Sequence, residues 1–254
     1  IDKRVARRAL GLPADEPIVL QLGRMVPRKG VDTVVEAFAR LFSAHGFDKG
    51  RLVIVGGESE QPDAQVTPEI GRLQLLSLRE RVADRVTFVG RRTREELKYF
   101  YSAADVFVTT PWYEPFGITP IEAMACGTPV IGADVGGIKF TVRDGETGFL
   151  VPPKDPVTLG ERLADLLRQP ELRQQLGRQA YRRVNHLFTW KKVAGSIDDV
   201  YRDVLRTVHS DRPLRIGSRA VVDRGFASAI QAIESSRRTL RGGIVEAAEI
   251  LVGS

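Results

Sequence analysis

The feature that most constrains the fold is an alternation of short apolar runs with longer amphipathic segments. Strands are expected at residues 17–22, 51–55, 86–89, 105–109, 129–131 and 149–151, with helices between them and after the last one. Helix starts are signalled separately. Thr93 and Glu96 have the spacing of a capping box, and Asp155 precedes a proline at a first helical position. Strands that alternate with helices predict a parallel, doubly wound α/β sheet.

The chain divides into three parts of different character. Residues 1–205 carry the alternating pattern, and residues 206–224 have the composition of a linker with a break near Pro213. Residues 225–254 repeat apolar positions at three-four spacing, which predicts an amphipathic helix that needs a partner. We interpret this last part as an oligomerisation helix or as the truncated start of a second domain. A faint resemblance to the opening helix of phosphosugar isomerase domains would imply a fused second enzyme.

Composition excludes several classes of protein. With 254 residues and 43% hydrophobic content, the chain can build a substantial core, so it is not disordered throughout. Cys126 is the single cysteine, which excludes a disulfide scaffold. No apolar run approaches the ~18–20 residues of a membrane-spanning helix. The chain begins with Ile1 and shows no secretory signal, so we expect a piece of a longer protein.

The positive charge is weak and dispersed. The net charge of +6 comes from 38 basic and 32 acidic residues, and aromatic residues make up only 7%. A nucleic-acid binder concentrates basic residues on one face and interleaves them with aromatics. We therefore expect no nucleic-acid partner. An anionic small molecule is compatible with the charge but not required by it.

The loop after the first expected strand is basic and begins and ends with glycine. Its sequence runs from Gly23 to Gly30, and Arg24 and Lys29 could flank an anion, one as a planar fork and the other as a compact charge. The loop has neither the G-x-G-x-x-G fingerprint nor the P-loop motif. From its residues alone, a solvated basic turn is an equally good interpretation.

Two carboxylates stand eight residues apart around the start of a predicted helix. Glu114 precedes Pro115 and is expected in an extended loop, whereas Glu122 is expected inside the helix. The free N–H groups at residues 116–119 would form an anion site that the helix dipole reinforces. Phosphates suit such a site and hydroxyl groups suit the carboxylates, and a nucleotide sugar carries both.

A third glycine-rich loop, residues 134–138, should reach the same edge of the sheet with tight turning or close backbone approach.

Other kinds of active site have little support in the sequence. The histidines His45, His186 and His209 lie far apart and give no metal-ligand spacing. No G-x-S-x-G elbow is present. Cys126 is expected to be a buried structural thiol.

The motifs together resemble a known family. The Gly-Arg-x4-Lys-Gly loop, the E-x7-E segment at residues 114–122, and Gly-Gly-Ile followed by Asp-Gly-x-Thr-Gly-Phe-Leu-Val-Pro-Pro resemble the donor-binding, C-terminal half of retaining GT-B glycosyltransferases. The similarity is to the family-4 type that includes sucrose-phosphate synthases and mannosyltransferases, and it covers about residues 8–205. It implies a Rossmann-like domain and a partner N-terminal domain, absent here, that binds the acceptor.

The resemblance also implies roles for individual residues. Arg24 and Lys29 would hold the donor diphosphate, and Glu114 would contact hydroxyls of the donor sugar. The remaining donor-binding positions would be Gly23, Gly90, Arg91, Phe116, Gly117, Ile118 and Glu122, with Glu122 on the ribose and residues 90–91 beside the base. No metal or cofactor would be needed, and no D-x-D motif occurs. Glu114 would not act as a nucleophile, because the leaving phosphate helps to deprotonate the acceptor.

The resemblance implies a hexosyltransferase that uses a nucleotide-diphosphate sugar and works in the cytoplasm, where such donors are made. The base, the sugar, the acceptor, the oligomeric state and any peripheral contact with a membrane stay open. We expect the isolated chain to bind donor weakly and to transfer little sugar. The alternatives are a non-catalytic nucleotide-binding module left by truncation, a glycosidase that uses Glu114 and Glu122, and an NAD-dependent dehydrogenase that lacks its glycine fingerprint.

Overall fold

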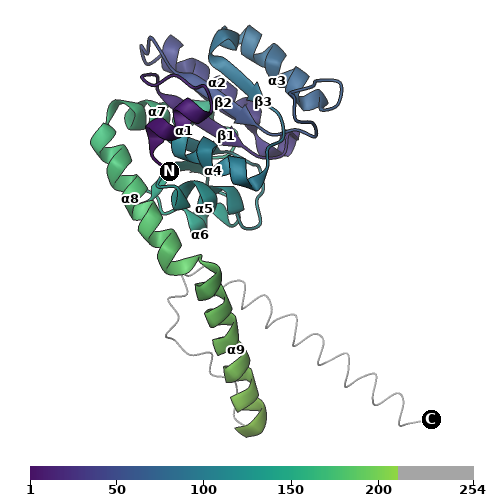
Figure 1. The fold of residues 1–254 in the computed structure, drawn as a ribbon, viewed down its shortest axis with the longest axis vertical. Coiled ribbons are helices and arrows are strands. Elements are labelled where there is room, and N and C mark those ends of the chain that lie inside the picture. Colours follow the sequence, from purple (N-terminus) through teal and green to yellow (C-terminus); the bar gives the residue numbers. More distant parts are fainter. Residues whose placement is uncertain (211–254) are drawn as a thin grey trace, which may run out of the picture. The chain divides into compact units, whose positions relative to one another are not determined.

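The computed structural model describes residues 1–210, and a single parallel sheet forms its centre (Figure 1). The strands are β1 (Ile18–Leu22), β2 (Arg51–Val55), β3 (Val86–Val89), β4 (Val106–Thr109), β5 (Val130–Ala133) and β6 (Gly148–Val151). Their order is β3-β2-β1-β4-β5-β6, and every neighbouring pair is parallel. A sheet that winds outward from β1 in both directions is Rossmann-like. The predicted fold class is confirmed for this region.

The strand boundaries agree closely with the sequence pattern. Strands β2 and β3 occupy the expected residues, whereas β5 continues two residues beyond its expected end at Ile131. The extension arises because Gly132 and Ala133 pair with Leu150 and Val151 of β6. Pairing with a neighbouring strand is a tertiary property, so the local pattern does not reveal it.

Helices cover both faces of the sheet. They are α1 (Lys3–Ala9), α2 (Val31–Ser43), α3 (Pro68–Arg79), α4 (Arg94–Ala103), α5 (Ile118–Ala125), α6 (Ile138–Thr141), α7 (Pro156–Arg168), α8 (Pro170–Leu187) and α9 (Trp190–Ser210). Single turns of 3-10 helix occur at Pro27–Lys29 and Ala83–Arg85. Helices α1 and α6 were not expected, because seven and four residues are too few to show a helical period. None of the helices described in residues 1–210 has the length and apolarity needed to cross a membrane.

Two layers of buried apolar side chains lie between the sheet and the helices, one on each face. Alternate residues of each strand point to opposite faces, so Val19 joins the layer under α2, α3 and α7, whereas Leu20 joins the layer under α4, α5 and α8. Phe38 of α2 and Met124 of α5 are fully buried in these two layers. The strands are therefore apolar on both faces, which explains why the sequence shows continuous apolar runs.

The helix-start signals act as the sequence indicates. The side chain of Thr93 and that of Glu96 form the reciprocal bonds of a capping box at α4. Asp155 accepts hydrogen bonds from the N–H groups of Val157 and Thr158 at the start of α7. Both predictions of helix starts are confirmed.

The C-terminal part differs from the expectation in one respect. The chain separates into the units Ile1–Ala194 and Gly195–Ser254, and α9 continues to Ser210. Residues 206–210, expected to begin a linker, are therefore helical, because the first proline after Trp190 is Pro213 and nothing earlier breaks the helix. The rest of the expected linker and the expected helix at 225–254 lie outside the described residues.

Candidate functional site

A cavity of about 390 Å³ lies beyond the carboxyl ends of β1 and β4. Its lining residues are Arg24, Arg28, Lys29, Tyr113, Glu114 and Pro115. They come from the loop after β1 and the loop after β4, which adjoin because these strands are neighbours at the point where the strand order reverses. Ligands of doubly wound sheets bind at this switch point. The structure thus brings Arg24, Lys29 and Glu114 into one cavity.

The two loops are fastened to each other through their backbones. The N–H of Trp112 donates to the carbonyl of Arg28 at 2.9 Å, and the Thr110 hydroxyl donates to the carbonyl of Gly30 at 2.8 Å. Gly30 has a φ of 65°, and a Cβ atom at this position would collide with the backbone of Thr110. Glycine is therefore required where the basic loop turns into α2.

The third glycine-rich loop supports Glu114 from the other side. The N–H of Gly137 donates to the Glu114 carbonyl at 2.8 Å. A Cβ atom on Gly136 would meet that carbonyl, and one on Gly137 would meet the backbone of Phe116. The predicted close backbone approach is confirmed, and its partner is the loop that carries Glu114.

An ion pair joins the two loops across the cavity. Lys29 Nζ lies 2.6 Å from Glu114 Oε2, and the two side chains are 18% and 19% exposed. Burial works against ionisation of the Glu114 carboxyl, but the hydrogen bond and charge of Lys29, with the N–H groups of Gly117 and Phe116, hold its pKa below the ordinary value. Glu114 is therefore ionised at neutral pH.

The start of α5 lies beside the carboxylate of Glu114. Gly117 has a φ of 88° and precedes α5, and the N–H groups of Gly117 and Phe116 contribute to the lowered pKa of that carboxylate. Binding of a phosphate by the N–H groups of residues 116–119 stays a prediction. The side chains of Phe116 and Ile118 are exposed, and the Phe116 ring also packs edge-on against Phe188.

Glu122 does not line this cavity. Its Oε2 accepts a hydrogen bond from the Tyr101 hydroxyl at 2.8 Å, and it is not among the lining residues. Tyr101 is only 2% exposed, and burial, with the charge of Glu122, raises its pKa so that the hydroxyl stays protonated. The two glutamates of the E-x7-E segment therefore do not face each other across one cavity, which disfavours a glycosidase that uses them as a pair.

Gly90, Arg91 and Gly23 do not line the cavity. A Cβ atom on Gly90 would collide with the backbone of Ser59 and Glu60, and the N–H of Arg91 donates to the Ser59 carbonyl at 2.7 Å. The N–H of Gly23 donates to the Val55 carbonyl at 3.0 Å. Loop packing thus accounts for glycine at position 90.

Sequence reasoning missed three lining residues, which are Arg28, Tyr113 and Pro115. Arg28 carried a signal, since it lies between Arg24 and Lys29 in the same basic loop. Tyr113 carried none, because no pattern distinguishes an aromatic residue beside Glu114 from a residue of the core. A tertiary arrangement is needed to place its ring at the cavity.

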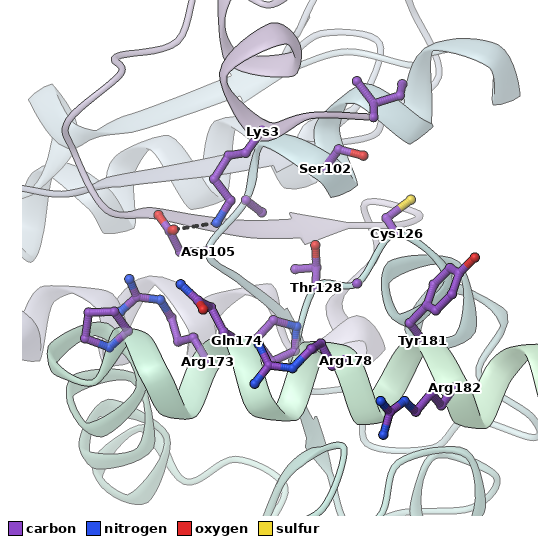
Figure 2. Close-up of a pocket in the computed structure, with 16 residues that line it drawn as sticks. Lys3, Ser102, Asp105, Cys126, Thr128, Arg173, Gln174, Arg178, Tyr181 and Arg182 are labelled. Atoms are coloured by element: carbon purple, nitrogen blue, oxygen red, sulfur yellow. Dashed lines mark hydrogen bonds and ion pairs between the residues drawn. The ribbon is translucent and has the colours of Figure 1, made fainter.

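A larger cavity, about 560 Å³, lies at the opposite edge of the sheet (Figure 2). Arg173, Arg178 and Arg182 of α8 face Lys3 and Asp105 across it, and its wall includes residues that precede β4 and β5. Because doubly wound sheets bind ligands at the carboxyl edge, the smaller cavity is the stronger candidate.

Cys126 also lies on the wall of this larger cavity. It is free and half-buried, and burial raises the pKa of its thiol. A thiol that is protonated at neutral pH is a poor nucleophile, which fits the structural role that the sequence indicates. Within residues 1–210, no group of three His, Cys, Asp or Glu side chains is placed to hold a metal ion.

The strand order defines a Rossmann-like α/β domain. The cavity at its switch point is lined by cations and therefore suits an anionic ligand. The comparison with protein families agrees with this class. The chain belongs to the family described as glycosyl transferases group 1, whose model matches residues 2–183. The resemblance to the C-terminal domain of GT-B glycosyltransferases is confirmed.

Individual relatives are similar over about the same region. A D-inositol 3-phosphate glycosyltransferase of Acidothermus cellulolyticus is 40% identical over 220 residues, which is 86% of this chain and 48% of the relative. The structure of sucrose-phosphate synthase from Thermosynechococcus elongatus is 44% identical, with a TM-score of 0.70 over 80% of this chain and 49% of that one. The Anabaena protein HepE, in complex with UDP-glucose, shares the fold at 24% identity and a TM-score of 0.68, over 79% and 52% of the two chains. This chain spans about half the length of these relatives.

Proposed function

We propose that this chain is the donor-binding domain of a retaining, metal-independent hexosyltransferase that uses a nucleotide-diphosphate sugar. The observation that carries the proposal is the convergence of Arg24, Arg28 and Lys29 with Glu114 in one cavity at the switch point of the sheet. Membership of the glycosyl transferases group 1 family supports it. The UDP-glucose complex of HepE, which has the same fold, is consistent with a nucleotide sugar as the ligand.

The cationic loop is assigned to the diphosphate. Three cations against one carboxylate leave the cavity with a net positive charge. Arg24 and Lys29 bind the diphosphate of the donor, and Arg28 adds a third positive charge. Cations fixed before the reaction stabilise the negative charge that develops on the leaving nucleotide. They take the place that a divalent metal ion fills in other transferases.

The carboxylates are assigned to hydroxyl groups. Glu114 accepts hydrogen bonds from the donor sugar, and the segment from Phe116 to Ile118 lies beside it. Glu122 binds the ribose and is oriented by the buried hydroxyl of Tyr101. Gly90 and Arg91 lie against the base, and Gly23 allows the nucleotide to approach the end of β1.

The transfer step needs no protein nucleophile. The bond between the anomeric carbon and the phosphate oxygen breaks, and the acceptor oxygen bonds to that carbon on the same face. The acceptor proton passes to the departing phosphate oxygen. Glu114 is assigned to the hydroxyls of the donor sugar and not to nucleophilic attack.

The acceptor is assigned to a second domain, since this chain spans about half the length of its relatives. We therefore expect the isolated chain to bind donor weakly and to transfer little sugar. The cytoplasm is the proposed location, because nucleotide sugars are made there.

Calorimetric titration with UDP, GDP and ADP, and with their glucose and mannose conjugates, tests the proposal. One nucleotide series should bind, and Lys29→Ala and Glu122→Ala should each weaken that binding. Lys98→Ala is the matched control, because it removes one exposed lysine charge on α4. A folded chain that binds no probe, alone or joined to its second domain, would refute the proposal. Binding without transfer by the full-length protein would instead indicate a non-catalytic nucleotide-binding module.

A further inference from the structure

Lys29 forms an ion pair in the structure, whereas its cationic neighbours Arg24 and Arg28 form none among the described residues. Lys29 Nζ contacts Glu114 Oε2 at 2.6 Å, and both side chains are about four-fifths buried. Neither Arg24 nor Arg28 forms an ion pair with any residue that the structure describes, although both line the same cavity. A diphosphate that enters the cavity therefore meets two available guanidinium groups and one ammonium group already bound to a carboxylate.

The backbone of Glu114 is held beside the cavity. Its carbonyl accepts the N–H of Gly137 at 2.8 Å, and Gly136 packs directly against the same carbonyl. Rotation of the Glu114 or the Lys29 side chain can separate the two charged groups without moving this backbone. A carboxylate that stays near the cavity would repel a phosphate oxygen.

We propose that Glu114 is an internal competitor of the diphosphate for Lys29, and that it makes the site select an intact nucleotide sugar over the free nucleoside diphosphate. The inference rests on the proposed function. A free nucleoside diphosphate takes Lys29 and removes the one cationic partner of the largely buried Glu114 carboxylate, which is unfavourable. An intact donor also takes Lys29, but its sugar hydroxyls donate to the carboxylate and replace the lost contact.

The same competition acts after transfer. When the sugar has left, Glu114 loses its hydroxyl partners and returns to Lys29, so the nucleoside diphosphate loses a cationic contact. Glu114 thus weakens binding of the product more than binding of the donor. Its role is discrimination between two ligands that share the same base and diphosphate.

Binding of inorganic pyrophosphate, which has neither base nor sugar, tests the competition directly. Glu114→Gln keeps the size of the side chain but cannot form the ion pair, and it should bind pyrophosphate at least about fivefold more tightly than the wild type. Glu114→Asp keeps the charge but is one methylene shorter, and it should also bind more tightly. Glu161→Gln is the matched control, because it removes one exposed charge on α7 and should leave binding unchanged.

A second comparison uses the nucleoside diphosphate that binds the wild type and its sugar conjugate. The ratio of their affinities should fall in Glu114→Gln, because the free nucleotide gains affinity while the conjugate loses a hydroxyl partner. In the wild type, the carboxyl carbon resonance of Glu114 should shift when pyrophosphate is added, a readout that needs no variant.

Three outcomes would refute the competition. Glu114→Gln could bind pyrophosphate no better than the wild type, Glu114→Asp could remain at the wild-type value, which would indicate long-range charge alone, or the Glu114 resonance could stay unmoved at saturating pyrophosphate. If the wild type still bound a nucleotide sugar, the proposed function would stand and only this inference would fail. If neither the wild type nor Glu114→Gln bound any of these probes, both would fail.

Discussion

Two ion-paired carboxylates stand at opposite edges of the same sheet and differ in how completely they are satisfied. Asp105, before β4, lies 2.8 Å from Lys3 Nζ and 2.7 Å from an Arg7 nitrogen, and it also accepts the N–H of Ile18 at 2.8 Å. Arg7 in turn donates to the backbone carbonyl of Ala103. Glu114, beyond β4, has one cationic partner, Lys29, and a cavity beside it.

The difference separates a structural ion pair from one available to a ligand. At Asp105 two cations share one carboxylate, but Arg7 and Asp105 are almost fully buried, and Arg7 also donates to the backbone carbonyls of Ala103 and Ala14. At Glu114 three cations share one carboxylate, and two of them have no anionic partner among the described residues. Cations without a protein partner beside a cavity favour an anionic ligand, whereas a buried carboxylate bound by two cations and a backbone N–H holds elements together.

The largest effect is expected at Asp105. Asp105→Asn should lower the free energy of unfolding by roughly 3 kcal/mol, because Arg7 is left buried without its counter-charge. Denaturant unfolding measures the change. Asp84→Asn, which breaks a 3.9 Å surface pair with Arg85, is the control and should change stability by less than ~0.5 kcal/mol. Equal stability losses in the two variants would contradict the structural role of Asp105.

Substitution of Lys29 should affect ligand binding more than the free energy of unfolding. Lys29→Ala should weaken binding of the nucleotide sugar at least about tenfold, because a charge-assisted contact to the diphosphate is lost. It should change stability by less than ~1 kcal/mol, since Glu114 keeps the N–H groups of Gly117 and Phe116. Calorimetric titration and unfolding of the same samples separate the two effects. A stability loss as large as that of Asp105→Asn would remove the distinction between the two pairs.

Tyr101 gives an intermediate case. Tyr101→Phe removes the hydrogen bond to Glu122 and should lower stability by about 1 kcal/mol. Donor affinity should fall by about two- to fivefold if Glu122 binds the ribose, because its carboxylate is less well oriented. Tyr181→Phe, which removes an exposed hydroxyl on α8, is the matched control. Unchanged donor binding in Tyr101→Phe would argue against a binding role for Glu122 oriented by Tyr101.

The smallest effect is expected when the pH is lowered, and it concerns the free energy of unfolding. Asp105 and Glu114 both have a pKa below the ordinary values of 3.8 and 4.5. The stability that each contributes is therefore complete above its ordinary value and is lost as the pH falls below it. Unfolding measured between pH 6 and pH 3, as an approximate range, should show a loss of stability below about pH 4.5. Asp105→Asn should flatten this dependence more than Glu114→Gln does.

Most of the fold was accessible from the sequence, because it depends on local patterns. Apolar runs place β2 and β3 correctly, and the cap at Asp155 places the start of α7. The short helices α1 and α6 escaped prediction, since neither has enough residues to show a period. The end of α9 at Ser210 was missed because the sequence between Leu205 and Ser210 contains no signal that stops or continues a helix.

The candidate site was accessible only in part. The glycine-rich, basic loop and the E-x7-E segment indicate the elements that form it, and topology places Lys29 near Glu114. The partner of each carboxylate was not accessible. Glu114 pairs with Lys29 of another loop, and Glu122 accepts a hydrogen bond from Tyr101, a residue twenty-one positions away in the sequence.

The sequence by itself determined the class of this protein, the order of its strands and helices, and the loops in which its chemistry resides. These features follow from periodicity, capping and glycine placement, which act over a few residues. Only the tertiary structure decided which of those residues touch. The 2.6 Å contact of Lys29 with Glu114, and the absence of such a partner for Arg24 among the described residues, depend on how two loops eighty-five residues apart are fastened through Thr110 and Gly30. Distances of this kind are set by packing of the whole sheet, and no local pattern encodes them.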